Sequence, residues 1–531
     1  MSSLDIGLTL HQAGELDGAA NVYQSVLATD PKIHRAAFLL GVVNLQRQEW
    51  GRAAIALRSA VAQNACEADY HVALGVALRN LGDLDGAFSA YTKAMSLNSS
   101  SADVYNNLGA LHETAGNQES AAECYQAAIR LRPGFSEAHY NLGNISRFKR
   151  RFIEAADHYR RALVADPAHR KAAVNLAVAL CGTNNFAEAE RVLRQIVSRV
   201  PDDARVVSLL GYVMIATGQW NGASELLTDF FARSARQKYI SGANPQAMRH
   251  DCEQIRYLSG LSYDIPSIAR AVETIGSLPG AQYNGTDAAS ATEGLARVLA
   301  DTFYIQNCES LDRSPLSDNM VFWGDEAGVL SGAKTHLVID GLLTNEALFQ
   351  LRDFCLSSTI WSTSSCGGEL IANMHTGFSC PLLFQISGDL KRRMPALFGD
   401  QQLIMAWAYR YIGDAPEFGP HADPGLTTVN FWITPDEANL DQNCGGLQIW
   451  GVQAPSHYIE QERPAQLETV RELLSSSALE PEVIRYRCNR AVIYPSSAIH
   501  STDRYRFATG YADRRMNVTL LFGDIASRTG H

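Results

Sequence analysis

Three polar side chains in the last quarter of the chain have the types and order expected of ligands for one metal ion. His421 and Asp423 stand two residues apart, directly after the Gly419-Pro420 break. One imidazole and one carboxylate at this spacing can reach a single ion from the end of a strand and the turn after it. His500 follows at a distance and can supply a third ligand. Two histidines and one carboxylate on one face of an ion, with the other positions open, are typical of non-haem Fe(II) sites.

Each of these residues also has a plain structural interpretation. The first two could form a surface turn with an exposed acid. His500 ends the run 491–499, a predicted apolar strand and turn, and could be a buried histidine with its hydrogen bonds satisfied. His375 and His457 compete for the third position, but neither ends a predicted strand in the right order. The order of the surrounding motifs favours the metal interpretation.

Residues 331–531 must supply the elements that bring these side chains together. From Thr335 the pattern changes to short apolar runs between turns rich in Gly, Pro, Asn and Asp, which predicts strands. Residues 344–357 predict a helix with Thr344 as its N-cap. The segments predicted as strands are 336–340, 403–412, 427–434, 446–450, 483–486, 491–494 and 517–522. Their spacing indicates an antiparallel double-sheet barrel of the jelly-roll class.

Five short motifs follow one another in this region in the order known from one enzyme family. They are Tyr411-Ile412-Gly413-Asp414, His421-Ala422-Asp423, Gly445-Gly446-Leu447, His500 and Arg514-Arg515. Over residues 335–525 the chain resembles the Fe(II)- and 2-oxoglutarate-dependent dioxygenases, and within them the prolyl-hydroxylase-like branch. The resemblance implies a double-stranded β-helix in residues 331–531, with His421, Asp423 and His500 as the catalytic metal ligands.

The same resemblance implies the cofactors and the reaction. Members of the family use Fe(2+), 2-oxoglutarate and O2, with ascorbate in a supporting role, and couple hydroxylation of a substrate to the conversion of 2-oxoglutarate into succinate. Members that halogenate carry a small residue at the position of Asp423, which leaves room for a halide. A carboxylate at this position therefore implies hydroxylation.

The distal carboxylate of 2-oxoglutarate needs a cation, and arginine suits it because its planar fork meets a carboxylate through two hydrogen bonds. In this family that arginine lies on the strand after the second histidine, where Arg514 and Arg515 both qualify. Strand alternation places Arg515 on the same face as Asn517 and Thr519, and Arg514 on the opposite, apolar face. We therefore expect Arg515 to line the site.

Other side chains near these motifs are candidates for the co-substrate pocket. The resemblance implies Tyr411 as a second contact to 2-oxoglutarate, and Tyr409 on the same face is its alternative. Thr519 and Asn430 are further candidates for direct contacts. Trp432 could wall the pocket or belong to the core.

Residues 1–235 contain an internal repeat with a period of about 34 residues. Small residues recur at this interval in two series, and tyrosines and prolines follow in the same register. The two series are Gly7, Gly41, Gly75, Gly109, Gly143, Ala177 and Gly211, and Ala19, Ala53, Ala87, Ala121, Ala155, Ala189 and Ala223. This pattern predicts two antiparallel helices per repeat and resembles the tetratricopeptide repeat, in about seven units without an insertion.

Such an array stacks into a superhelix with a concave groove. The resemblance therefore implies a protein or peptide ligand in the groove. The alternative is a scaffold or dimerisation surface. Residues 236–330 break the rhythm and predict a helical connector, with helix-like stretches at 267–275 and 291–304.

Composition narrows the class of partners. A formal net charge of −11 and a pI near 5.7 argue against a general nucleic-acid binder. No apolar run reaches the length of a membrane helix, and the N-terminus lacks the basic stretch of a signal peptide. The ten cysteines include no Cys-x-x-Cys pair. These features predict a cytoplasmic protein with reduced cysteines.

Three functions are consistent with this organisation. The first is a protein hydroxylase whose repeats capture a polypeptide and present a prolyl, Asn, Asp or Lys side chain to the iron. The second is a small-molecule oxygenase whose repeats serve assembly. The third is a repeat adaptor whose oxygenase fold has lost catalysis. The intact set of two histidines, one aspartate and an arginine argues against the third, while the first two stay open.

Overall fold

The computed structural model describes residues 2–240, 245–260, 305–330, 332, 334–363, 369–411, 419–456, 458, 463–477 and 479–526. The chain divides into two compact units, Met1–Thr183 and Asn184–His531. The helix-like stretches predicted at 267–275 and 291–304 lie outside the described residues, as does the Ile412-Gly413-Asp414 part of one motif. The domain boundaries predicted after residues 235 and 330 therefore stay predictions.

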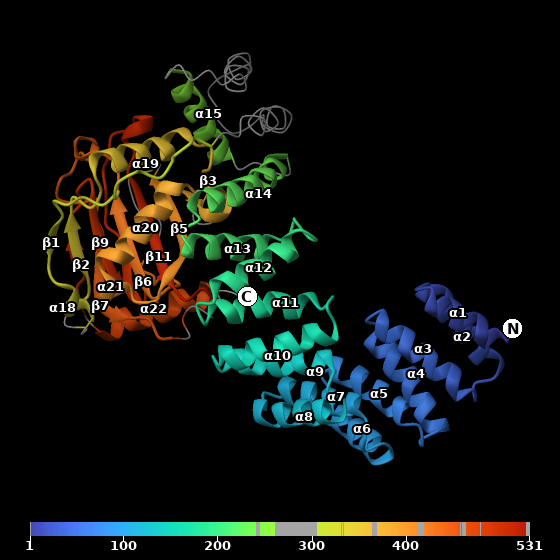
Figure 1. Ribbon diagram of the computed structural model, residues 1–531. Helices are drawn as coiled ribbons and strands as arrows, with labels where there is room; N and C mark the ends of the chain where they lie inside the picture. The colour runs from blue at the N-terminus through green and yellow to red at the C-terminus, as the bar shows by residue number, and fades with distance from the viewer. Residues whose placement is uncertain are drawn as a thin grey trace. The chain divides into compact units, whose positions relative to one another are not determined.

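The first unit consists of antiparallel helix pairs, as the repeat period predicts (Figure 1). The first series of small residues lies in the first helix of each pair, and the second series lies in the second helix. The alanines of the second series, from Ala19 to Ala155, are fully buried. The helices are α1 (Ser3–Gln12), α2 (Leu16–Thr29), α3 (His34–Gln46), α4 (Trp50–Gln63), α5 (Ala68–Asn80), α6 (Leu84–Leu97), α7 (Ala102–Thr114), α8 (Gln118–Leu131), α9 (Ser136–Phe148), α10 (Phe152–Ala165) and α11 (Arg170–Cys181).

In several repeats a tyrosine of the second helix covers the glycine of the first helix. A Cβ added to Gly75 would lie 2.5 Å from Cε1 of Tyr91, and one added to Gly109 would lie 2.6 Å from Cε1 of Tyr125. Both tyrosine rings are fully buried. The missing side chain therefore lets the two helices of one repeat approach closely, and the ring fills the space between them.

Gly75→Ala is expected to lower the free energy of unfolding by about 1–3 kcal/mol, because the new methyl group overlaps the Tyr91 ring. Gly51→Ala is the matched control, since Gly51 lies in α4 and a Cβ added there meets no atom within 4 Å. This control is expected to raise the stability by about 0.5–1 kcal/mol, the helical advantage of Ala over Gly. Urea unfolding followed by circular dichroism measures both changes. Equal stability of the two variants would contradict the close packing at Gly75.

The second unit begins with helices that pack on the sheets. The hydroxyl of Tyr212 lies 3.0 Å from Nε2 of His375, and the hydroxyl of Ser224 donates to the carbonyl of Ser379 at 2.8 Å. Tyr212 and Ser224 belong to α13 and α14, which continue the repeat rhythm. The helices are α12 (Phe186–Val197), α13 (Ala204–Ala216), α14 (Trp220–Ile240) and α15 (Pro245–Gly260). The end of the repeat rhythm therefore belongs to the same compact unit as the sheets.

The described strands form two antiparallel sheets, a large sheet and a small sheet. The large sheet has the order β1-β2-β9-β6-β11-β5-β4-β3 and the small sheet has the order β10-β7-β8. The strands are β1 (Val321–Trp323), β2 (Leu337–Asp340), β3 (Ser362–Thr363), β4 (Glu369–Asn373), β5 (Gln402–Tyr411), β6 (Thr427–Trp432), β7 (Leu447–Gln453), β8 (Glu482–Ile484), β9 (Arg490–Pro495), β10 (Ala498–Thr502) and β11 (Met516–Gly523). The predicted barrel is thus confirmed only as two sheets, since neither sheet closes among the described strands.

The seven predicted strands all have counterparts, but the prediction for His500 was wrong in one respect. The sequence predicts that the histidine follows an apolar strand and a turn, which together cover residues 491–499. The turn is confined to Ser496 and Ser497, and His500 lies inside β10. Strand β9 pairs within the large sheet, whereas β10 pairs with β7 of the small sheet. The chain therefore changes sheets at this turn, which local sequence patterns do not reveal.

The remaining helices of the second unit include α19 and α20, drawn along the large sheet in Figure 1. The N-cap prediction at Thr344 is confirmed, because its hydroxyl accepts the backbone N–H of Ala347 at 3.2 Å. These elements are α18 (Glu326–Leu330), α19 (Asn345–Ser357), η1 (Met374–Thr376), α20 (Pro381–Arg393), α21 (Pro395–Phe398), η2 (Asp436–Ala438), α22 (Arg463–Ser477) and η4 (Tyr511–Asp513). Among the helices that the structure describes, none combines the length and apolarity needed to cross a membrane.

Candidate metal centre

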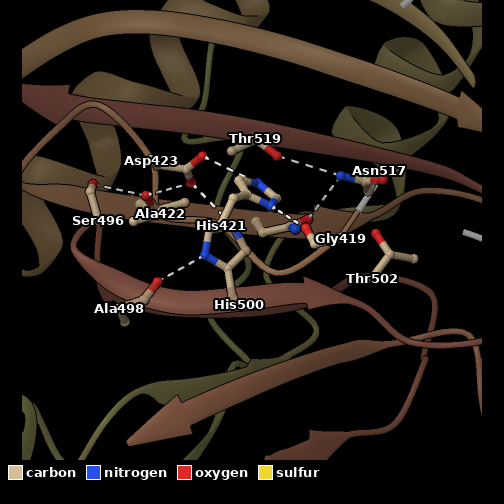
Figure 2. Close-up of polar contacts among 12 residues, drawn as sticks. Gly419, His421, Ala422, Asp423, Ser496, Ala498, His500, Thr502, Asn517 and Thr519 are labelled. Carbon is tan, nitrogen blue, oxygen red and sulfur yellow. Dashed lines mark hydrogen bonds and ion pairs between the residues drawn. The ribbon is translucent and has the colours of Figure 1, made fainter. Parts of the chain in front are cut away.

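The structure brings the three predicted metal ligands together. One ligand atom from each of His421, Asp423 and His500 lies within 4.8 Å of the others. Nε2 of His421 is 3.9 Å from Oδ1 of Asp423, and Nε2 of His500 is 3.5 Å from Oδ2 of the same carboxylate. Figure 2 shows the two imidazoles and the carboxylate turned toward one another. The 4.8 Å span is compatible with one ion between these atoms.

Backbone hydrogen bonds between the segment of His421 and Asp423 and the segment of His500 bring the three ligands together. His421 and His500 form an antiparallel bridge, in which each backbone N–H donates to the carbonyl of the other at 2.9 Å. The N–H of Asp423 donates to the carbonyl of Ser496 at 2.9 Å. The segment of the first two ligands therefore runs beside β10, so the long separation of Asp423 and His500 in the sequence does not separate them in space.

Both imidazoles are oriented through their Nδ1 atoms. Nδ1 of His421 lies 3.0 Å from the carbonyl of Gly419, and Nδ1 of His500 lies 3.0 Å from the carbonyl of Ala498. Because a carbonyl only accepts, each Nδ1 carries a proton, and each Nε2 faces the carboxylate of Asp423. Metal-binding histidines are commonly held in this way, by a hydrogen bond from the other ring nitrogen to a carbonyl.

Hydrogen bonding fixes the carboxylate of Asp423, and burial keeps the imidazole of His500 neutral. The hydroxyl of Thr428 donates to Oδ2 of Asp423 at 3.1 Å and shares a 2.8 Å hydrogen bond with Ser496. Burial lowers the pKa of His500 to about 4, and the hydrogen bond to Ala498 offsets only part of this. His500 is therefore neutral near pH 7. Two imidazoles and one carboxylate suit Fe(II) and similar divalent transition ions better than Mg²⁺ or Ca²⁺, which prefer oxygen.

The three ligands face a small cavity, of about 30 Å³, between the large and small sheets. Strands of both sheets contribute to its wall, and the lining side chains are mostly polar or aromatic. The lining residues besides the ligands are Glu369, Trp407, Tyr409, Tyr411, Asn430, Leu447, Tyr494, Thr502, Asn517 and Thr519. The centre therefore lies where strands of both sheets meet, and the side chain of His421 is 25% exposed there.

Arg515 lies behind Tyr411 and not in the cavity wall. Its Nε donates to the carbonyl of Gly445 at 2.7 Å, and the terminal nitrogens donate to Gly446 at 3.1 Å and to Asn517 at 3.2 Å. Its Cζ is 4.3 Å from the centroid of the Tyr411 ring. The guanidinium is buried, and no carboxylate in the described part of the chain lies within ion-pair distance. The expectation that it lines the cavity is therefore not met, although its face is the expected one.

The other predicted pocket residues form two separate hydrogen-bonded groups. The amide of Asn517 donates to Asn430 at 3.2 Å and to Thr519 at 3.4 Å. The hydroxyl of Tyr411 shares a 2.9 Å hydrogen bond with Thr502. All of these residues line the cavity. Asn517 thus links the guanidinium of Arg515 to the polar side of the cavity.

The arginine, the histidines and the tryptophan that the sequence offers as alternatives for the metal site and the co-substrate pocket do not line the cavity where the structure describes them. Arg514 lies 2.8 Å from the carboxylate of Glu253 in α15, away from the cavity. The imidazole of His375 contacts Tyr212. His457 lies outside the described residues. Trp432 is fully buried and does not line the cavity, so it belongs to the core.

Two buried residues beside the centre were not predicted from the sequence. Glu369 lies on β4, opposite Tyr411 in the strand register, and is 1% exposed. Tyr494 lies on β9, with its ring centroid 4.9 Å from that of His500. Burial, with the charge of Asp423 adding to it, raises the pKa of Tyr494 well above its usual range. No spacing rule relates either residue to the motifs, because only strand pairing places them there.

Comparison with known families identifies the repeats. Two tetratricopeptide-repeat family models match, one over residues 4–65, 72–135 and 106–170, and the other over 149–211. None of the curated proteins matches the chain.

Three solved repeat structures are similar to part of the chain. The crystal structure of MamA is 28% identical, with 31% of this chain and 97% of that chain covered and a TM-score of 0.28. Pseudomonas aeruginosa pilF is 23% identical, with 37% and 89% covered and a TM-score of 0.34. YrrB, titled a TPR protein with an unusual peptide-binding site, is 22% identical, with 32% and 88% covered and a TM-score of 0.27. The family matches establish that the N-terminal region of this chain consists of tetratricopeptide repeats.

Proposed function

We propose that this protein is an Fe(II)- and 2-oxoglutarate-dependent hydroxylase that acts on a side chain of a protein or peptide captured by its repeats. The observation that supports the proposal is the convergence of His421, Asp423 and His500, with both Nε2 atoms facing the carboxylate. In this proposal residues 331–531 form a double-stranded β-helix, for which two facing antiparallel sheets with the centre between them are the support.

The donor set determines what the residues would do. His421, Asp423 and His500 would hold one face of the ion and leave the other positions to ligands from outside the chain. When bound, Fe(II) with 2-oxoglutarate and O2 supplies the chemistry that converts a substrate C–H bond to C–OH, with succinate and CO2 as the other products. Asp423 supplies a carboxylate where a halogenating enzyme needs an open position, which supports hydroxylation.

Arg515 and Tyr411 would hold the distal carboxylate of 2-oxoglutarate. The buried guanidinium of Arg515 has no carboxylate within ion-pair distance among the described residues, and an anionic ligand would offset the cost of burying it. Three of its N–H groups donate to neighbouring oxygens, so the group is held rigidly. Since Tyr411 lies between this guanidinium and the cavity, its ring must turn or share the carboxylate through its hydroxyl.

The repeats give the protein a role in protein interaction. Tetratricopeptide arrays present a concave surface to partner chains. We extend this to substrate capture, in which the array binds a polypeptide and the cavity receives one of its side chains.

A two-part experiment tests the proposal. Full-length protein with Fe(II) and ascorbate is expected to convert 2-oxoglutarate to succinate. Proteins captured on immobilised full-length protein are then incubated with active enzyme and analysed by mass spectrometry for the addition of one oxygen atom. Succinate formation with oxygen added to captured proteins supports the proposal. Capture without any succinate formation indicates a repeat adaptor, and succinate formation without modified proteins indicates a small-molecule oxygenase.

A further inference from the structure

Helix α15 packs on the outer face of the large sheet, behind the proposed co-substrate residues. It contacts α19, β3 and η4. The side chain of Gln254 is fully buried, and its amide donates to the carbonyls of Leu356 at 2.9 Å and Ser358 at 2.8 Å. These two hydrogen bonds, to the C-terminal end of α19, fix the position of α15 on the sheet.

The first link from α15 to the site is a buried hydrogen-bonded chain. Arg410 lies on β5 and is fully buried, and its guanidinium nitrogen is 3.2 Å from Nε2 of His250. Arginine only donates, so Nε2 accepts and Nδ1 of His250 donates to Asp251 at 3.1 Å. Burial, with the charge of Arg410 adding to it, holds the pKa of His250 well below its usual range, consistent with this neutral tautomer. Arg410 is the immediate neighbour of Tyr411.

The second link is an ion pair. The carboxylate of Glu253 lies 2.8 Å from the guanidinium of Arg514, the immediate neighbour of Arg515. The hydroxyl of Tyr511, just upstream, donates to the carbonyl of Leu356 at 2.9 Å, and its ring lies 3.7 Å from Cζ of Arg410. Both links therefore meet at the segment that enters β11.

We infer that α15 positions the co-substrate residues of the proposed hydroxylase from the opposite face of the sheet, through the pairs Glu253–Arg514 and His250–Arg410. Neighbouring residues of an extended chain point to opposite faces, so fixing Arg410 and Arg514 outside sets the directions of Tyr411 and Arg515 inside. The backbone joins the two, because the N–H of Tyr411 donates to the carbonyl of Arg515 at 3.1 Å. The inference rests on the proposed function, and it makes Glu253 a positioning residue with no contact to the ligand.

Three variants of the full-length protein test this inference: Glu253→Gln, Arg514→Gln and the double variant. Calorimetry measures the affinity of the Mn(II)-loaded protein for 2-oxoglutarate, and a separate titration measures Mn(II) affinity. Each single variant is expected to weaken 2-oxoglutarate binding by about 10-fold, within the range of coupling between residues in contact, and to change Mn(II) affinity by less than about two-fold. The double variant is expected to lose no more than either single variant, because both remove the same pair.

Two further variants separate positioning from general stability. Glu468→Gln is the matched control, since Glu468 forms an exposed 3.4 Å pair with Arg471 on α22, and it is expected to bind 2-oxoglutarate as the wild type does. The charge swap Glu253→Arg with Arg514→Glu restores the pair and is expected to recover most of the affinity. A merely structural pair would instead lower the unfolding temperature and the Mn(II) affinity together.

The possible outcomes distinguish this inference from the proposed function. Wild-type affinity in Glu253→Gln overturns the positioning role. A loss in Arg514→Gln alone also overturns it, because it would make Arg514 a direct ligand of 2-oxoglutarate. If Glu253→Gln unfolds, the test is the double variant Glu253→Arg with Arg514→Glu. If that variant folds but does not recover the affinity for 2-oxoglutarate, the inference is overturned. Absence of 2-oxoglutarate binding by the wild type would instead remove the proposed function itself.

Discussion

Asp423→Ala is expected to reduce succinate formation from 2-oxoglutarate by more than about 100-fold, beyond the usual effect of losing an outer-shell partner of a metal site. The variant removes the only carboxylate of the three-residue ligand set and leaves two imidazoles. Its fold should persist, since the backbone N–H of residue 423 keeps its bond to Ser496 and Thr428 keeps its bond to the same serine. Mn(II) titration should show the corresponding loss of metal affinity.

Asp318→Ala is the control for Asp423→Ala. The carboxylate of Asp318 belongs to the same unit, pairs with Arg393 at the surface and has 90% side-chain exposure. It is expected to retain wild-type metal affinity and turnover. Equal turnover by the Asp423 variant and the wild type would exclude residue 423 as a metal ligand and remove the enzyme proposal.

Arg515→Ala is expected to weaken 2-oxoglutarate binding by about 1.5–3 kcal/mol, the range for a hydrogen bond to a charged group. This corresponds to roughly a 10- to 150-fold higher Kd. The physical reason is the loss of the buried cation that we propose for the distal carboxylate. Calorimetry of the Mn(II)-loaded protein measures the change without turnover.

Arg515 also has a structural role, so the variant needs a control. The guanidinium donates to the carbonyls of Gly445 and Gly446, and alanine would leave both without this donor. Arg515→Lys keeps the charge and part of the hydrogen bonding, and should retain more affinity than alanine. Unchanged affinity in Arg515→Ala, with a loss in Arg514→Ala that Glu253→Gln does not reproduce, would show that our assignment of the strand face is wrong.

The repeats could be predicted from short-range sequence patterns. A glycine and an alanine at fixed places in successive repeats predict helix pairs, because both residues act on neighbours within the same repeat. Gly75 and Tyr91 lie in adjacent helices of one repeat and meet directly. The N-cap at Thr344 is local in the same sense, since its partner Ala347 belongs to the first turn of the same helix.

Residue types and order also predicted the candidate ligands, but pairing between distant segments decided the geometry. The sequence predicts His500 at the end of an apolar strand and turn, but the residue lies inside β10, and its bridge to His421 turns its imidazole toward Asp423. The two arginines at 514 and 515 were equivalent in type. The position of Glu253 in α15 gives one of them a partner outside the cavity, while the other is buried beside Tyr411.

The sequence alone therefore determined the helical repeats, most of the strands and the identities of three candidate metal ligands. Only the tertiary structure decided that these ligands converge, that Glu369 and Tyr494 stand beside them, and that α15 braces the opposite face of the sheet. The physical reason is the distance in sequence between the residues that interact. Repeat packing and caps involve residues a few positions or one repeat apart. The hydrogen bond between His250 and Arg410 joins residues 160 positions apart, and it exists only once α15 has packed on the large sheet.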